Sequence, residues 1–179
     1  MRVAEGPQES GSGPRWYAVR VKSRHEKKVC AGLSGAGMEV FLPLHTSLRR
    51  WSDRMQRVEL PLFPGYVFVR CEMRSEQKLA LLRSSRSVVE VLGVRGQPVP
   101  VPDREVESVR LLLAWGTGIE GQDGLAAGAP VVVVAGPLAG VVGVVVEQRG
   151  ARRIVCSIPI LGRSVLSDLQ AGDVVPYLG

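Results

Sequence analysis

The chain has 179 residues, of which 45% are hydrophobic and 5% aromatic, and its formal net charge is +6. This length allows one large domain or two small ones, and no apolar run approaches the roughly 18 residues that span a membrane. Three widely separated cysteines argue against a disulfide framework and against a zinc site, so the composition fits a cytoplasmic globular protein.

The basic excess belongs to the first part of the chain alone. Residues 1–115 hold 19 Lys and Arg against 12 Asp and Glu, a net charge of +7. Residues 116–179 hold 4 against 5, a net charge of −1. We therefore expect only the first part to meet a polyanion.

The first predicted strand covers residues 16–21, WYAVRV, and follows a disordered lead-in, residues 1–14, that lacks the apolar segment of a signal peptide. Ser23 as N-cap and Glu26 three residues later predict a capping box and a helix over about residues 24–35. Five basic side chains crowd this strand-to-helix corner: Arg20, Lys22, Arg24, Lys27 and Lys28. Such a run can be a solvated helix face, but its density makes phosphate contact an equal alternative.

A strand and a hairpin are predicted next. Residues 38–48 alternate as a strand, and Pro43 within them suggests an edge or a bulge. Residues 49–55 predict a hairpin tip, with residues 56–60 as the returning strand. Trp51 lies among arginines there, where it could stack on a base or pack on its own hairpin.

The stretch ELPLFPGYVFVR, residues 59–70, organises the first part of the chain. In its strand, Val67 and Val69 alternate with Tyr66 and Phe68, which is the period of a sheet. One face can bury the valines. The other face is either buried as well, as in a central strand, or offers its aromatic side chains to a partner.

The remaining pattern predicts two units. A helix over residues 75–83, a strand at 87–93 and a last helix from about residue 103 complete an antiparallel sheet flanked by helices, an α+β fold. Residues 116–124 hold four glycines and predict a flexible linker that favours free tethering over docking. Residues 125–178 predict about five short strands in a small β-barrel, because their valine runs suit strands and their Gly and Pro residues interrupt helices.

These motifs resemble the NusG family of transcription elongation factors. WYAVRV, LFPGYVFV and PVPVPDREVESV are similar to its N-terminal domain, and VVVVAGPLAGVVGVV is similar to its KOW motif. The resemblance implies an N-terminal domain at residues 15–115, a linker at 116–124 and a five-stranded KOW β-barrel at 125–178. The KSRHEKKV segment looks closer to the specialised paralogues of the RfaH, UpxY and LoaP types than to the housekeeping factor.

The resemblance also implies a function. Members of the family bind the clamp helices of RNA polymerase and modulate pausing, termination or antitermination. The positions that match the polymerase-binding motif are Phe63, Pro64, Tyr66 and Phe68.

The specialised paralogues also contact exposed non-template DNA, and the KOW domain in the family can bind ribosomal protein S10 or Rho. The positions that match the DNA contacts are Lys22, Arg24, His25, Lys28 and, through a looser alignment, Arg86. His25 could equally be an ordinary exposed helix residue.

Two other classes of protein remain open. A ribosome-associated, RNA-binding KOW protein would also be basic, but its positive charge should lie on the KOW domain, whose half of this chain has a net charge of −1. An enzyme is not expected, because His25 and His45 fall in different elements without a supporting acid or nucleophile. We expect no cofactor, no metal and no membrane association, and a monomer.

Overall fold

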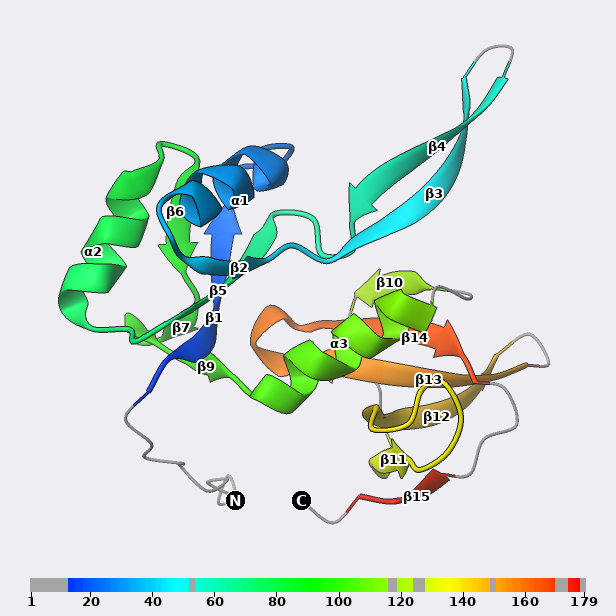
Figure 1. Cartoon of the computed structure of the whole chain (residues 1–179). Coiled ribbons are helices and arrows are strands. Elements are labelled where there is room, and N and C mark those ends of the chain that lie inside the picture. The colour runs from blue at the N-terminus through cyan, green and yellow to red at the C-terminus, as the bar shows by residue number, and fades with distance from the viewer. Residues whose placement is uncertain are drawn as a thin grey trace.

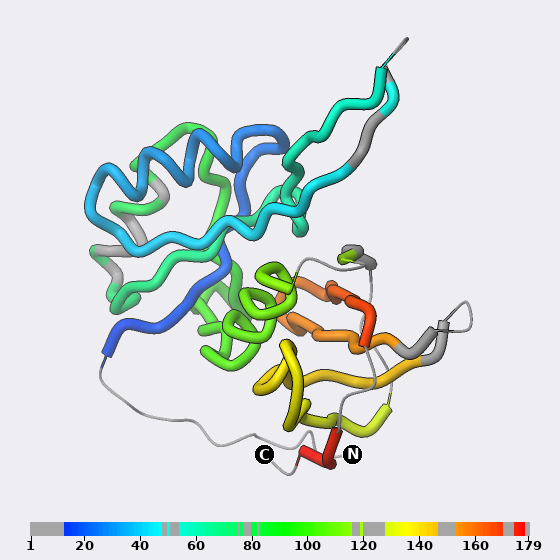
Figure 2. The backbone as a smooth tube through the Cα atoms, turned by 45° about the vertical axis from the view of Figure 1, so that its right-hand side comes forward, coloured from blue at the N-terminus to red at the C-terminus, as the bar shows by residue number. Residues whose placement is uncertain are grey.

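The computed structural model describes residues 13–51, 54–115, 119–123, 128–148, 151–169 and 174–177. They form an N-terminal unit of strands and helices, from which a hairpin projects, and a C-terminal unit of strands, with helix α3 between them (Figures 1 and 2). The predicted disordered lead-in lies almost wholly outside the described residues.

The N-terminal unit is built on a five-stranded antiparallel sheet. Its order is β2-β5-β1-β6, and β9 also pairs with β1. The strand from the organising stretch, β5, is therefore central. The bounds are β1 (Arg15–Val21), β2 (Glu39–Phe41), β5 (Tyr66–Cys71), β6 (Val88–Val91) and β9 (Pro100–Val101).

Three helices cover the two faces of this sheet (Figure 1). Helices α1 (Glu26–Gly35) and α2 (Ser75–Ser84) pack on one face, and α3 (Asp103–Trp115) packs on the other. The α+β architecture predicted for this part is confirmed. None of the helices in the described part of the chain is long and apolar enough to cross a membrane.

The projecting hairpin consists of β3 (Leu44–Trp51) and β4 (Arg54–Pro61). The single strand predicted over residues 38–48 is wrong, because the chain leaves the sheet at Pro43 and the two halves become β2 and β3. Pro43 has no N–H to donate to a ladder, and its carbonyl oxygen accepts a bond from Leu62 N–H at 2.8 Å. A second, short hairpin joins β7 (Gly93–Val94) to β8 (Gln97–Pro98).

The C-terminal unit is a six-stranded sheet in the order β10-β14-β13-β12-β11-β15. Its described residues contain no α-helix, only the 3-10 turn Pro159–Leu161, so the prediction of strands is confirmed. Within the sheet, a Cβ at Gly143 would lie 2.5 Å from the Val155 carbonyl oxygen, so only glycine fits there. The strands are β10 (Glu120–Asp123), β11 (Val131–Val133), β12 (Val142–Gln148), β13 (Ala151–Ile158), β14 (Arg163–Asp168) and β15 (Val174–Pro176).

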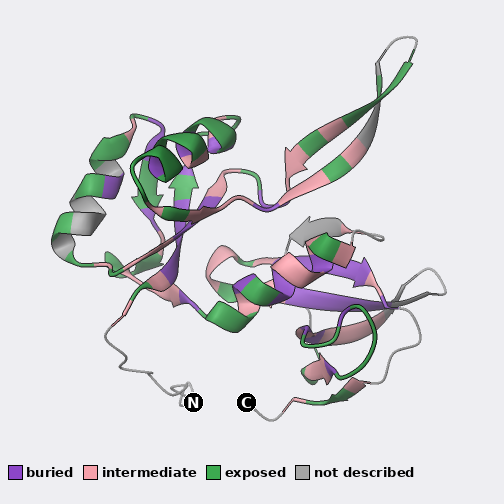
Figure 3. Ribbon diagram, in the orientation of Figure 1, coloured by how far each residue is buried: buried purple, intermediate pink, exposed green. Residues whose placement is uncertain are grey.

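The predicted flexible linker and its free tethering need correction. Residues 120–123 form β10, which pairs with β14, while residues 116–118 and 124 lie outside the described residues. The two units are also not separate, because one hydrophobic cluster contains buried side chains from both. Burial is concentrated on β1 and β5 and along β13 and β14, on the two sides of α3 (Figure 3).

Candidate functional site

Strand β5 turns its side chains into two different clusters. Val67 and Val69 are fully buried beneath α1 and α2. Phe68, 1% exposed, points the other way and meets Phe41 and Phe63 with ring centroids 6.0 Å apart. The alternation predicted for this strand is confirmed. Both of its faces are buried, because α3 and the C-terminal unit together cover the second one.

The second face carries five aromatic residues, which we call the aromatic face. Trp16 meets Phe41 edge-on at 6.4 Å, and the guanidinium of Arg110 on α3 lies 5.0 Å above both rings. The face thus draws on β1, β2, β5 and the loop before β5, all fixed by the sheet. Its members are Trp16, Phe41, Phe63, Tyr66 and Phe68.

A buried carboxylate of α1 binds the loop before β5, which carries Phe63 of the aromatic face. Glu26 is 4% exposed, and its Oε1 accepts a hydrogen bond of 2.8 Å from the N–H of Gly65, which has φ +85°. The predicted capping box is therefore wrong: the N-cap of α1 is His25, without a side-chain capping bond. The partly buried Gly65 N–H requires an acceptor, and Glu26 supplies it instead of capping its own helix.

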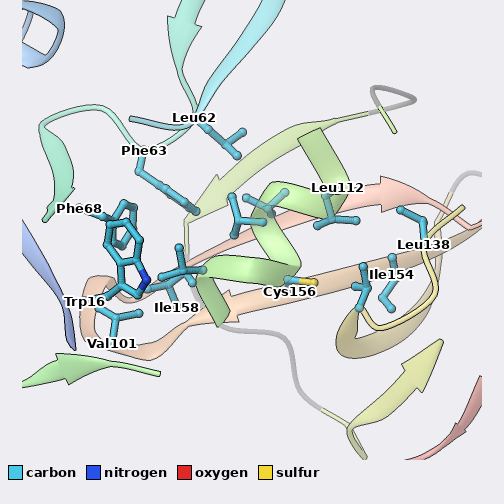
Figure 4. Packing of buried hydrophobic residues seen from close by; sticks show 14 of the residues in the cluster. Trp16, Leu62, Phe63, Phe68, Val101, Leu112, Leu138, Ile154, Cys156 and Ile158 are labelled. Atoms are coloured by element: carbon cyan, nitrogen blue, oxygen red, sulfur yellow. The ribbon is translucent and has the colours of Figure 1, made fainter. Parts of the chain in front are cut away.

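The C-terminal unit covers the aromatic face through apolar and polar contacts. Figure 4 shows Ile158 of β13 beside Trp16 and Phe68, and Cys156 of the same strand next to α3, the helix that carries Leu112. Across the same boundary, the Arg163 guanidinium lies 5.8 Å above the Tyr66 ring.

We call the arrangement in which the C-terminal unit packs on α3 and the aromatic face the closed form. Helix α3 makes two polar contacts with the C-terminal unit in this form. The N–H of Val142 donates to Ser108 Oγ at 3.1 Å, and Arg104 Nη1 donates to the Tyr177 hydroxyl at 3.1 Å. Sequence reasoning did not identify Ser108 or Arg104, because neither side chain has a partner nearby in the sequence.

The four residues predicted to contact a polymerase thus differ in accessibility. Phe63 and Phe68 are buried in the cluster that α3 and the C-terminal unit form over the sheet, and Tyr66 is half-buried under Arg163. Pro64 is exposed.

The five residues predicted to contact DNA lie together at the end of β1, and we call them the basic corner. Lys22, Arg24 and Lys28 are exposed at the start of α1, and His25 is half-buried, with Nδ1 3.0 Å from the carbonyl oxygen of Ser23. Arg86 is exposed and joins them because the Lys22 N–H donates at 2.8 Å to the carbonyl of the residue after Arg86. No cluster of His, Cys, Asp or Glu suited to a metal occurs among the residues that the structure describes.

Comparison with known proteins identifies the family. The family model described as "Transcription termination factor nusG" matches residues 14–110, just over half of the chain. The chain belongs to the NusG family. The NusG family comprises non-enzymatic transcription termination and antitermination factors, in line with the function class expected from the sequence.

Relatives of this NusG-family chain align over nearly its whole length. The transcription termination/antitermination protein NusG of Pseudomonas aeruginosa is 30% identical over 172 residues, which are 89% of this chain and 97% of that protein. The Thermus thermophilus NusG is 28% identical over 180 residues, with shares of 89% and 97%. A solved structure titled "Domain interaction in Thermotoga maritima NusG" has a TM-score of 0.52 at 27% identity, with shares of 91% and 97%.

Proposed function

We propose that this protein regulates transcription elongation by binding the clamp helices of RNA polymerase through its aromatic face, and so modulates pausing, termination or antitermination. One observation carries the proposal. Five aromatic side chains gather on one face of the sheet, three of them, Phe63, Tyr66 and Phe68, at positions of the family's binding motif, and the C-terminal unit supplies part of the surface that covers them. Aromatic side chains in an apolar patch are the usual energetic centre of a protein interface.

Binding through this face requires the two units to separate. In the closed arrangement Phe63 and Phe68 are each 1% exposed, so a partner cannot reach them. The apparent affinity of the full chain is then lower than that of the open form by the fraction of molecules that are open. The proposed function therefore includes an equilibrium between a closed and an open form.

Tyr66→Ala should weaken binding to core RNA polymerase by more than about 1 kcal/mol, because it removes one aromatic anchor. Arg163→Gln is the matched control. Both substitutions break the contact between Arg163 and the Tyr66 ring, so both loosen closure, but only the first alters the aromatic face. Binding is measured by fluorescence anisotropy of the labelled full chain. Equal affinities for the two variants would contradict the proposal.

The basic corner supports a second contact, with exposed non-template DNA. It brings together the exposed cationic side chains of Lys22, Arg24, Lys28 and Arg86 and the half-buried imidazole of His25. The first three and His25 lie between β1 and the first turn of α1, and Arg86 lies just before β6, which pairs with β1. Cationic side chains that release counterions from phosphates give binding a steep dependence on salt.

Replacing Lys22 and Arg24 with Gln should make the salt dependence of single-stranded DNA binding shallower, by roughly 0.7 in log–log slope for each lost contact. The control is the pair Arg74→Gln and Arg95→Gln, which removes the same charge from exposed positions outside the corner. If both double variants change the slope equally, the corner acts only through net charge. An unchanged slope in the first variant would make it a solvated surface.

The finer assignments follow from the family resemblance and the strand content. We propose that the C-terminal unit is a KOW β-barrel, with residues 15–115 and 125–178 as the two domains. Ribosomal protein S10 and Rho are its candidate partners, and the protein is proposed to act as a cytoplasmic monomer of the specialised type. The ribosome-associated alternative is disfavoured, because the C-terminal half has a net charge of −1.

A further inference from the structure

A buried carboxyl oxygen without a hydrogen-bond partner among the described residues lies where the two units meet. Glu105 is in the first turn of α3, one helical turn before Ser108, which bonds to Val142 of the C-terminal unit. Residues three apart share a helix face, so Glu105 also faces that unit. Its Oε2 atom is buried and has no hydrogen-bond partner among the described residues.

The groups around Glu105 do not compensate its charge. Arg104, from the same helix, is exposed and directs its guanidinium to Tyr177 of the C-terminal unit, 5.5 Å from the ring centroid. From β13, the buried thiol of Cys156 lies close enough for the charge of Glu105 to act on it. Strands β1 and β12, which also pack on α3, contribute apolar side chains such as Trp16 and Val145.

This environment favours the neutral carboxylic acid. Burial raises the pKa of Glu105 from an ordinary 4.5 to about 7, although the positive charge of Arg104 opposes the shift. Burial, together with the charge of Glu105, also raises the pKa of Cys156 to about 12, so this group remains a thiol near neutral pH. A buried carboxylate without a partner is costly, and protonation removes most of that cost.

We propose that closure of the two units is coupled to a proton: the closed form holds it on the Glu105 carboxyl group, and opening releases it. Separation removes β13 and its Cys156 from α3 and returns the carboxyl group to water. The inference concerns closure alone and holds whatever partner the open form binds, so it fails or stands independently of the polymerase proposal.

The direction of the coupling follows from linkage. Because the pKa is higher in the closed form, the closed form binds the proton more tightly. Closure is therefore strongest below the ordinary carboxyl pKa, weakens as the pH rises towards about 7, and is independent of this group above that. With one proton involved, the opening constant rises by at most about tenfold per pH unit.

A direct test is the titration of the Glu105 side-chain carbon by NMR in the full chain labelled with 13C-glutamate, with the resonance assigned from the Glu105→Gln spectrum. We expect a midpoint near pH 7. A midpoint in the ordinary glutamate range, in a chain whose Val142 amide resonance shows that it is closed, would overturn the proposal.

A second measurement follows closure itself, through the amide resonance of Val142, whose N–H bonds to Ser108 only in the closed form. Glu105→Gln should keep this resonance in its closed position from pH 5 to pH 8, whereas the natural chain shifts towards the open position. Glu107→Gln, on the same helix but exposed and 3.7 Å from Arg110, should titrate like the natural chain. The same pH dependence in Glu105→Gln as in the natural chain would overturn the proposal.

Discussion

A chain carrying Ser108→Arg should bind RNA polymerase more tightly than the natural chain. Ser108 is 2% exposed and contacts Val142 across the boundary between the units. An arginine there would bury a charge without a partner, a cost of several kcal/mol that opening relieves. Every 1.4 kcal/mol by which opening becomes easier raises the apparent affinity about tenfold, until the chain is fully open.

The control for this prediction is Ser34→Arg, the same substitution on the exposed surface of α1. Affinity is measured with core polymerase in the absence of DNA, so that the added positive charge does not act through nucleic acid. Loss of the closed form is verified by the Val142 amide resonance. An open Ser108→Arg chain with unchanged affinity would show that the aromatic face is not what the polymerase binds.

Phe68→Ala should lower the free energy of unfolding of the full chain by about 3–5 kcal/mol, as is usual for deletion of a buried phenylalanine. The ring is 1% exposed and packs between Phe41 and Phe63. Tyr66→Ala should cost less, because that ring is only half-buried. Urea denaturation of both variants measures the difference. Equal losses would mean that the two rings pack alike and would contradict the described closure.

The periodicity of the chain predicted the sheet better than it predicted the surroundings of the sheet. The alternation around Val67 and Phe68 identified a strand with two apolar faces, but the two interpretations of its second face remained open. In the structure this face is buried by α3 and the C-terminal unit, and the proposed function adds that the C-terminal unit leaves it on opening. A period-2 pattern reports that a face is apolar and carries no information on what covers it.

Two errors have the same physical origin. The glycines at 116–124 indicated backbone freedom, and free tethering followed from that alone. Docking is decided instead by apolar surfaces far from the linker, such as those of Phe68 and Ile158. Likewise, the local spacing of Ser23 and Glu26 fitted a capping box, but a tertiary bond to Gly65, 39 positions away, uses the carboxylate. Contacts between distant residues override local signals in both cases.

The positions of the basic corner were predictable because helix α1 follows strand β1 directly in the sequence. Residues in the short connection between them therefore lie close together in space. Arg86 joined them only through pairing of β1 with β6, which the sequence did not specify. Glu105 gave no signal at all, because an acidic residue in the first turn of a helix is ordinary. Its unusual environment arises only where the second unit packs on α3.

The cover over the aromatic face also determines how the free protein behaves at high concentration. A contiguous apolar patch that contains Trp16, Phe63 and Phe68 would, if left open, promote association between copies of the chain. Because the cover is tethered to the same molecule, its effective concentration is in the millimolar range and does not change on dilution. We therefore expect the chain to reach high concentrations without self-association. A partner binds the aromatic face only if its concentration and affinity allow it to compete with the effective concentration of the C-terminal unit.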